Sequence, residues 1–453
     1  MNRPEASSSG AQVTDGAANI YLERGFEQVT AVNSAGERLF SGRRLDGMAV
    51  RSTGAGDSFF VQRSGVGAGH VRALLSDVAE VAAGLPINYL EAALVSASQL
   101  VEGLAPTIAT KHDVVGELLA AAREGALSCG ARNAEARLWH QERCYVSGPD
   151  ISGAAGPALR QNVGMRRLTV SAGIGAQRGT VTIAELAHLP LTVERAAEAG
   201  RRAAERVANL AVATAPSRAR AAVVLAPEAA GVFAHEVIGH ALEADTAVSS
   251  SLWRQRGQSV SHPDLTVRDD GTDPWAWERV ASDEEGTPCT VAADLIVGGA
   301  VEGVLTDRAN AARLGVRASG HARRGAYTNP PVPRMRHLTV ERGPESPQEI
   351  IRDTADGILV LEVGSSDAVP AEGRFMIRVV EAREIVNGEI GRPLTGFTVH
   401  GGLAELATLD AVGNDAAGSV SMCGRQGRWL PVSHRAPTLR LGHLGIRGKG
   451  VPA

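Results

Sequence analysis

The pattern of apolar and polar positions along the chain predicts two halves of different build. In the first half, short alternating segments typical of β-strands precede and follow segments with apolar residues at three- and four-residue spacing, which is typical of amphipathic helices. The first three helical segments end at glycine, a common helix terminator. These patterns predict strands within 18–62, 134–148 and 166–186, and helices over 70–84, 87–103, 111–125 and 192–213.

The second half begins after a linker-like stretch at 214–220 with a continuous apolar run at 221–227, suited to a buried strand. A helix with two histidines follows at once, and most of the remainder is short and β-like. In "VNGEI", the pair Asn387-Gly388 between apolar runs predicts a tight hairpin. The sequence therefore predicts an α+β protein with a disordered N-terminus over 1–17, an N-terminal α/β region over 18–220, and a C-terminal antiparallel β-rich domain over 221–453, barrel- or sandwich-like, that carries the metal-binding helix.

Composition and charge exclude several classes of function. The 453 residues include 46 basic and 50 acidic side chains, and the net charge of −4 gives no electrostatic case for binding nucleic acid or an anionic membrane. Apolar runs are too short to span a membrane, and the polar first residues lack the apolar core of a secretory signal. The four cysteines show no short paired spacing, which favours a cytoplasmic protein without a disulfide framework.

The stretch "STGAGDSFF" at 52–60 resembles the phosphate-binding signature of ribokinase-type sugar kinases. That signature needs a long nucleotide-binding α/β domain before it, whereas Gly54 lies near the start of this chain. We therefore interpret the stretch as a glycine turn between two strands.

The helix after the apolar run carries "AHEVIGHALEAD", residues 234–245, which resembles a zinc-protease motif with one extra residue. In the common motif His-Glu-x-x-His, the two ligands lie about 40° apart around the helix axis. A spacing of five places His235 and His240 about 140° apart on a regular helix, too far for one zinc at about 2.0–2.1 Å from both rings. Gly239 tolerates unusual dihedrals, and a π-bulge there would turn His240 back towards His235. The spacing therefore predicts either no metal site or a helix distorted at this point.

Three features around the histidine pair favour a metal site. Glu236 directly follows the first histidine, where a general base for metal-bound water belongs. Glu243 can share the face of His240, as an orienting carboxylate or an additional ligand, and the preceding buried strand would give the site rigid support. A catalytic zinc usually takes three protein ligands. The residues alone leave the third open among Glu243, Asp245, another of the twelve histidines or a cysteine, of which Cys423 in the glycine-flanked "GSVSMCGRQG" stands out.

Together, these motifs resemble the TldD/PmbA family, and specifically its metal-binding TldD type. "HEVIGHALEAD" and "MCGRQG" are similar to the family's His-Glu-x-x-x-His helix and its late cysteine. The similarity is dense from about residue 221 to the end, with further agreement in "DDGTDPWAWERVASDEEGTP", "ASGHARRGAYTNPPVPRM", "IVNGEIGRPLTGFTVHGG" and "APTLRLGHLGIRG". One departure is "RMRHLTV", in which Arg336 and His337 stand where the family commonly has a smaller polar residue and asparagine.

The resemblance implies an N-terminal α/β region, a C-terminal β-rich domain, dimers and zinc-dependent peptide hydrolysis. Carried over residue by residue, it implies that His235, His240 and Cys423 bind one Zn²⁺ per chain and that Glu236 is the catalytic base. The histidine motif argues against an inactive PmbA/TldE-type subunit. We expect a homodimer or a heterodimer with such a sibling.

These observations predict a cytoplasmic zinc metallopeptidase that hydrolyses unfolded or small peptides, with a metal-bound water activated by Glu236. An extended peptide could bind by addition to a sheet edge. One alternative keeps the site but makes the protein an amide hydrolase that matures a peptide or small-molecule natural product. Another is a non-catalytic assembly subunit with structural zinc, although structural sites normally have four protein ligands.

Overall fold

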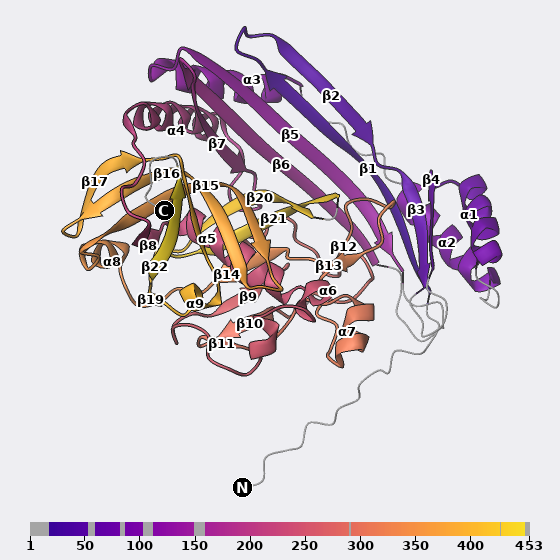
Figure 1. The fold of residues 1–453 in the computed structure, drawn as a ribbon. Helices are drawn as coiled ribbons and strands as arrows, with labels where there is room; N and C mark the ends of the chain where they lie inside the picture. Colours follow the sequence, from indigo (N-terminus) through magenta and orange to yellow (C-terminus); the bar gives the residue numbers. More distant parts are fainter. Residues whose placement is uncertain are drawn as a thin grey trace.

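The structure, a computed structural model, describes residues 18–52, 59–81, 87–102, 112–148, 159–289, 291–425 and 427–448. A long twisted sheet with helices lies against a more compact β-rich body (Figure 1). The predicted α+β class is confirmed. The disordered tail predicted over 1–17 lies outside the described residues, and the division into domains at 220/221 stays a prediction.

The long sheet is antiparallel throughout its described pairings. Its strands follow the order β4-β3-β1-β5-β6-β7, and β2 pairs with the second half of β1. Their bounds are β1 (Ala18–Val32), β2 (Arg38–Arg44), β3 (Gly47–Ser52), β4 (Phe59–Ser64), β5 (Asn133–Ser147), β6 (Leu159–Ile174) and β7 (Gln177–Ala184). Ser52 of β3 lies opposite Phe59 of β4, so the strands on both sides of the predicted glycine turn are confirmed, whereas the turn at 53–58 lies outside the described residues.

Helices cover one face of this sheet. α3 (His112–Ser128) and α4 (Val193–Val212) pack across β5, β6 and β7, and α1 (Ala68–Val81) and α2 (Ile87–Glu102) pack on β1 and β3. The hydroxyl of Thr192 accepts a hydrogen bond from the backbone N–H of Arg195 and caps α4. The helices predicted in this half are confirmed, with ends that differ by a few residues. Among the described residues, none of the helices is long and apolar enough to cross a membrane.

The opposite face of the sheet is fixed to the β-rich body. The rings of Trp139 on β5 and Trp277 in the body pack edge to face, with centroids 5.7 Å apart. Beside them, Arg143 pairs with Glu23 at 2.8 Å and with Glu284 at 3.5 Å, all three side chains being buried. Buried charges are tolerated where partners are well aligned, and these pairs join the sheet to the body.

The body is built on a closed barrel. Its strands follow the order β15-β8-β22-β18-β16, and β16 also pairs with β15, which closes the sheet on itself. β8 contains the predicted buried run and pairs in parallel with β15. The strands of the barrel and its extensions are β8 (Arg220–Leu225), β15 (Asp356–Val369), β16 (Arg374–Val386), β17 (Glu389–Leu394), β18 (Phe397–Gly401), β19 (Leu409–Val412) and β22 (Leu439–Gly448). The predicted hairpin joins β16 to β17, with φ of 53° at Asn387 and 77° at Gly388.

A second sheet follows the order β11-β10-β9-β14-β21-β20, with β20 at its edge and a parallel pairing between β14 and β21. Its strands are β9 (Val267–Asp269), β10 (Ala293–Val297), β11 (Ala300–Val301), β14 (His337–Val340), β20 (Ala417–Arg425) and β21 (Arg428–Ala436). A short ladder joins β12 (Ala322–Arg323) to β13 (Val332–Pro333). The histidine helix packs between this sheet and β15 of the barrel (Figure 1).

The sequence predicts mostly short β-like segments after the histidine helix, but the structure also contains several short helices there. These are α6 (Ala244–Ala247), α7 (Arg308–Leu314), α8 (Pro347–Arg352) and α9 (Leu403–Leu406). Local signals were present for two of them. Asp307 caps α7 by accepting from the backbone N–H of Asn310, and Ser346 forms a capping box with Glu349 at the start of α8.

Candidate metal centre

The histidine motif lies on a helix that changes its winding at the motif. α5 (Pro227–Ala234) begins directly after β8, continues as a π-helix over His235–Gly239, and ends in a 3₁₀ turn over His240–Leu242. The backbone N–H of His240 donates to the carbonyl oxygen of His235, which is the hydrogen bond of a π-helix. The predicted bulge is confirmed, and it places the two imidazole centroids 4.6 Å apart.

Three potential ligand atoms converge at this turn. Sγ of Cys423, on β20, lies 3.2 Å from Nε2 of His235 and 3.3 Å from Nε2 of His240. The three atoms are all within 4.8 Å of one another, and the three side chains are buried. A tetrahedral zinc with bonds of about 2.0–2.1 Å to nitrogen and about 2.3 Å to sulfur separates such ligand atoms by about 3.5 Å. The donors and their spacing therefore fit a zinc ion.

Gly239 has no Cβ, and this leaves room for a neighbouring side chain next to the π-helical turn. Its φ of −57° and ψ of −60° are ordinary helical values, so dihedral freedom, which the sequence suggested, is not what the site uses. A Cβ at this position would lie 1.9 Å from Sδ of Met335, a buried residue that packs against the π-helical turn. The sulfur of Met335 thus occupies the space next to the bulge.

We expect Gly239→Ala to destabilise the protein by about 1–3 kcal/mol, because overpacking a buried contact carries that cost, and to weaken zinc binding. Urea unfolding and zinc affinity measure both effects. Adding Met335→Ala should restore part of the loss. The matched control is Gly69→Ala in α1, where nothing lies within 4 Å of the new Cβ. Parental stability of Gly239→Ala would show that the contact with Met335 is not needed.

A buried carboxylate orients His240. Nδ1 of His240 lies 2.9 Å from Oε2 of Glu243. The other carboxylate oxygen, Oε1, accepts from the backbone N–H of Met335 and pairs with Nε of Arg334 at 3.3 Å. Burial alone would lower the pKa of His240, but Glu243 and Cys423 raise it to about 10. Burial would raise the pKa of Glu243, but His240 and Arg334 leave it lowered. A carboxylate bound to Nδ1 of a histidine fixes the orientation of a ring that binds metal through Nε2. Binding of zinc at Nε2 of His240 would displace the proton from that nitrogen.

A third histidine meets His235. Nε2 of His434, on β21, lies 3.0 Å from Nδ1 of His235. Burial, reinforced by His240, lowers the pKa of His235 well below its ordinary value, and burial together with His337 lowers the pKa of His434 to about 3. His235 and His434 are therefore neutral near pH 7, as an imidazole must be when it binds a metal.

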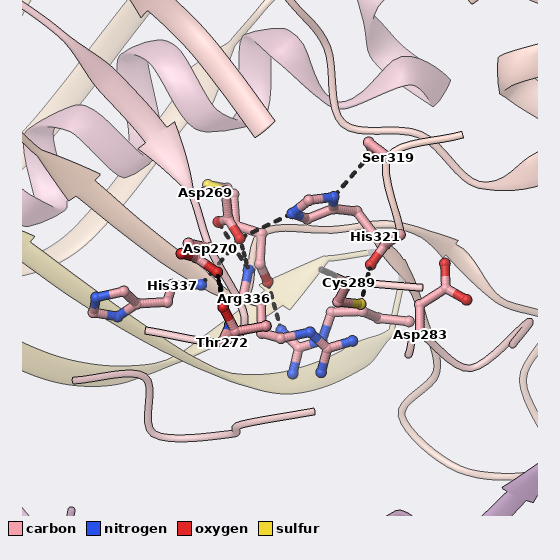
Figure 2. A network of polar contacts seen from close by, with 12 residues as sticks. Asp269, Asp270, Thr272, Asp283, Cys289, Ser319, His321, Arg336 and His337 are labelled. Carbon is pink, nitrogen blue, oxygen red and sulfur yellow. Dashed lines mark hydrogen bonds and ion pairs between the residues drawn. The ribbon is translucent and has the colours of Figure 1, made fainter. Parts of the chain in front are cut away.

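A buried arginine contacts the cysteine. Arg334 donates from Nη2 to Sγ of Cys423 at 2.9 Å. The segment that carries Arg334 is held by the network in Figure 2: Asp269 accepts from the backbone N–H groups of Arg336 and His337 and lies 3.0 Å from Nε2 of His321. Arg336 and His337, which depart from the family pattern, are buried in this network and do not line the cleft described next.

His235, His240 and Cys423 line a cleft of about 690 Å³. β8 pairs with β15 from Gly357 to Val360, and beyond that point β15 lines the cleft together with β20, the edge strand of the second sheet. Within the described strands, neither this part of β15 on the side of β8 nor the outer edge of β20 has a partner strand. Glu236 also lines the cleft and accepts a hydrogen bond of 2.7 Å from Oγ of Ser366 on β15.

The structure brings most of the sequence-predicted residues into one place. Among the candidate third ligands, Cys423 lies next to the histidine pair. Glu243 contacts Nδ1 of His240, the ring nitrogen that does not face Cys423, and Asp245 pairs with Arg425 at 3.4 Å. Four further residues at the site were not predicted from the sequence: Arg334, Ser366, Arg425 and His434. Their contacts join segments far apart in the chain, and a local pattern does not mark them.

Comparisons with known proteins identify the family of this chain. Residues 218–448, just over half of the chain, match the PmbA/TldA metallopeptidase C-terminal domain. The chain is 31% identical over 251 residues to the metalloprotease TldD homolog of Haemophilus influenzae, and 28% identical over 247 residues to the zinc metalloprotease TldD homolog of Saccharolobus solfataricus. Each match covers 54% of this chain, and 51% and 55% of those relatives, so the chain spans about half the length of the curated relatives it matches. The protein belongs to the TldD/PmbA family.

Solved structures match over nearly the whole chain. TldE from Thermococcus kodakarensis superposes with a TM-score of 0.68 at 16% identity, and a Thermotoga maritima protein with a TM-score of 0.70 at 17% identity. Each match covers 95% of this chain and 96% of the other. At such low identity the likeness establishes the fold, and it extends that fold to the long N-terminal sheet.

Proposed function

We propose that the protein is a zinc-dependent peptidase that hydrolyses unfolded or small peptides. The observation that carries this proposal is the convergence of His235, His240 and Cys423 in a cleft that also contains Glu236. The names of its relatives, metalloprotease and zinc metalloprotease, support the general class.

Nε2 of His235, Nε2 of His240 and Sγ of Cys423 would hold one zinc ion per chain. Zinc bound there would polarise the scissile carbonyl and activate water as a nucleophile near neutral pH. Among the described residues, the group contains these three donors and no fourth. Three protein donors fit a catalytic site better than a structural one, which usually has four, and this favours an enzyme over a non-catalytic assembly subunit.

Glu236 is the base in this proposal. It follows His235 in the π-helical turn, and Ser366 orients its carboxylate from the opposite wall of the cleft. The carboxylate would accept the proton of the attacking water and return it to the leaving amine nitrogen. Both walls are formed by strand edges, so an extended peptide could pair with β15 or β20 through its backbone. Backbone pairing requires an unfolded substrate and sets few demands on side chains.

The proposal includes a dimer, either of two copies or with a PmbA/TldE-type sibling, and the shared fold with TldE supports this pairing. The four cysteines are free, which supports a cytoplasmic location. Maturation of a peptide natural product would use the same site and stays an alternative.

The test is zinc-dependent hydrolysis of unstructured peptides of roughly ten residues, the length that strands of this size can pair with. We expect products by mass spectrometry from the zinc-loaded protein, tested alone and with any PmbA/TldE-type sibling, and loss of activity on chelation. Peptides N-methylated at alternate backbone nitrogens cannot donate to a strand edge, so they should be cleaved at least about tenfold more slowly, the equivalent of one or two lost hydrogen bonds. Equal rates for both peptides would refute strand pairing, and inactivity of every loaded form would refute the peptidase.

A further inference from the structure

We propose that His434 is a positioning residue for the metal centre: it accepts a hydrogen bond from Nδ1 of His235 and thereby keeps Nε2 of His235 free to bind zinc. The inference rests on the proposed function, because it concerns the same site.

The tautomer of His235 decides whether this side chain can be a ligand. Its Nε2 faces Sγ of Cys423 at 3.2 Å. A neutral imidazole that binds a metal through Nε2 carries its proton on Nδ1. Because His235 is buried, that N–H needs a partner inside the protein. Nε2 of His434 lies 3.0 Å away and is in the right place to accept.

The reverse arrangement would disable the ligand. If Nε2 of His434 donated, Nδ1 of His235 would accept, and the proton of His235 would lie on Nε2 and point at Cys423 in place of a metal. With His434 as acceptor, its own proton lies on Nδ1, an atom without a hydrogen-bond partner in the described part of the chain. Carboxylates and carbonyls fill this acceptor role at most metal-bound histidines, and here a second imidazole takes it.

Packing holds the ring of His434 at this distance. His434 is 2% exposed and lies opposite Ser419 in the β20–β21 ladder. On its other side is Gly231 of α5, where a Cβ would lie 2.8 Å from Cβ of His434. The planes of His434 and His235 are tilted by 78°, with centroids 4.8 Å apart. The hairpin β20–β21 therefore supplies both the cysteine ligand and the acceptor for His235.

Two substitutions separate hydrogen bonding from packing. His434→Gln keeps an acceptor oxygen near the position of Nε2, and His434→Leu removes it. We measure zinc affinity of the full chain by competition with a chromogenic chelator. His434→Leu should bind zinc about 10–100-fold more weakly, the usual effect of losing a group that orients a ligand, and His434→Gln should stay close to the parent. The matched control is His140→Leu, equally buried but on β5 of the long sheet and outside the group of candidate ligands.

Parental zinc affinity of His434→Leu would overturn the proposal. The proposal would also fail if His434→Gln bound zinc as weakly as His434→Leu, or if His140→Leu lost as much affinity. Nitrogen-15 NMR of histidines in the zinc-loaded parent gives an answer that does not depend on folding of a variant. We expect protons on Nδ1 of both His235 and His434, and a proton on Nε2 of His434 would contradict this. A parent that binds no zinc would instead refute the proposed function.

Discussion

Glu236→Gln is expected to slow peptide hydrolysis by about 10²–10⁴-fold, the usual contribution of a general base. Glutamine keeps the size of the side chain and can still accept the hydrogen bond that Ser366 donates at 2.7 Å. It cannot accept a proton from water at neutral pH. Zinc content and the unfolding midpoint should therefore stay close to the parent, while kcat/KM falls.

Ser366→Ala should have a smaller effect than Glu236→Gln and serves as a comparison. It removes the hydrogen bond that orients Glu236 but leaves the base, so its loss of kcat/KM should be smaller than that of Glu236→Gln. A Glu236→Gln protein that cleaves peptide at the parental rate would remove Glu236 from the mechanism. It would also weaken the peptidase proposal as a whole.

Cys423→Ala is expected to lower zinc affinity by at least about 100-fold, since losing a group that merely orients a ligand already costs about 10–100-fold. His235→Ala should lose zinc and activity together. Cys144→Ala is the matched control, because Cys144 is equally buried but lies on β5, away from the ligand group. If Cys423→Ala holds zinc as tightly as the parent, Glu243 becomes the better third ligand.

Local sequence patterns predict the parts of the fold that depend on neighbouring residues. The helix over 192–213, the buried strand predicted at 221–227 and the hairpin at Asn387-Gly388 follow from apolar spacing and turn chemistry. The helix and hairpin are confirmed, and the strand is confirmed up to Leu225, since Pro227 already begins α5. The parallel pairing of Leu225 with Val360 joins strands from distant parts of the chain. A strand's own pattern of apolar residues does not identify such a partner, so a β-rich domain could be predicted but its strand pairings could not.

In the candidate site too, local sequence predicts the residues that are close in the chain but not those that are far apart. His235, Glu236 and His240 are close in sequence, and their spacing allows a metal site only if the helix is distorted there, as the π-helix of the structure is. Cys423 lies 183 positions from His240, and family resemblance rather than spacing selected it. His434 lies 199 positions from His235, so its contact could not be read from either local segment.

X-ray absorption at the zinc edge of the purified zinc-loaded protein identifies the atoms bound to the metal. We expect one sulfur at about 2.3 Å and two imidazole nitrogens at about 2.0–2.1 Å, with a light atom in the remaining position. The sulfur contribution should disappear in any zinc retained by Cys423→Ala. Zinc bound by the parent without sulfur, or a parent that does not retain zinc, would contradict the assignment of His235, His240 and Cys423 as its ligands.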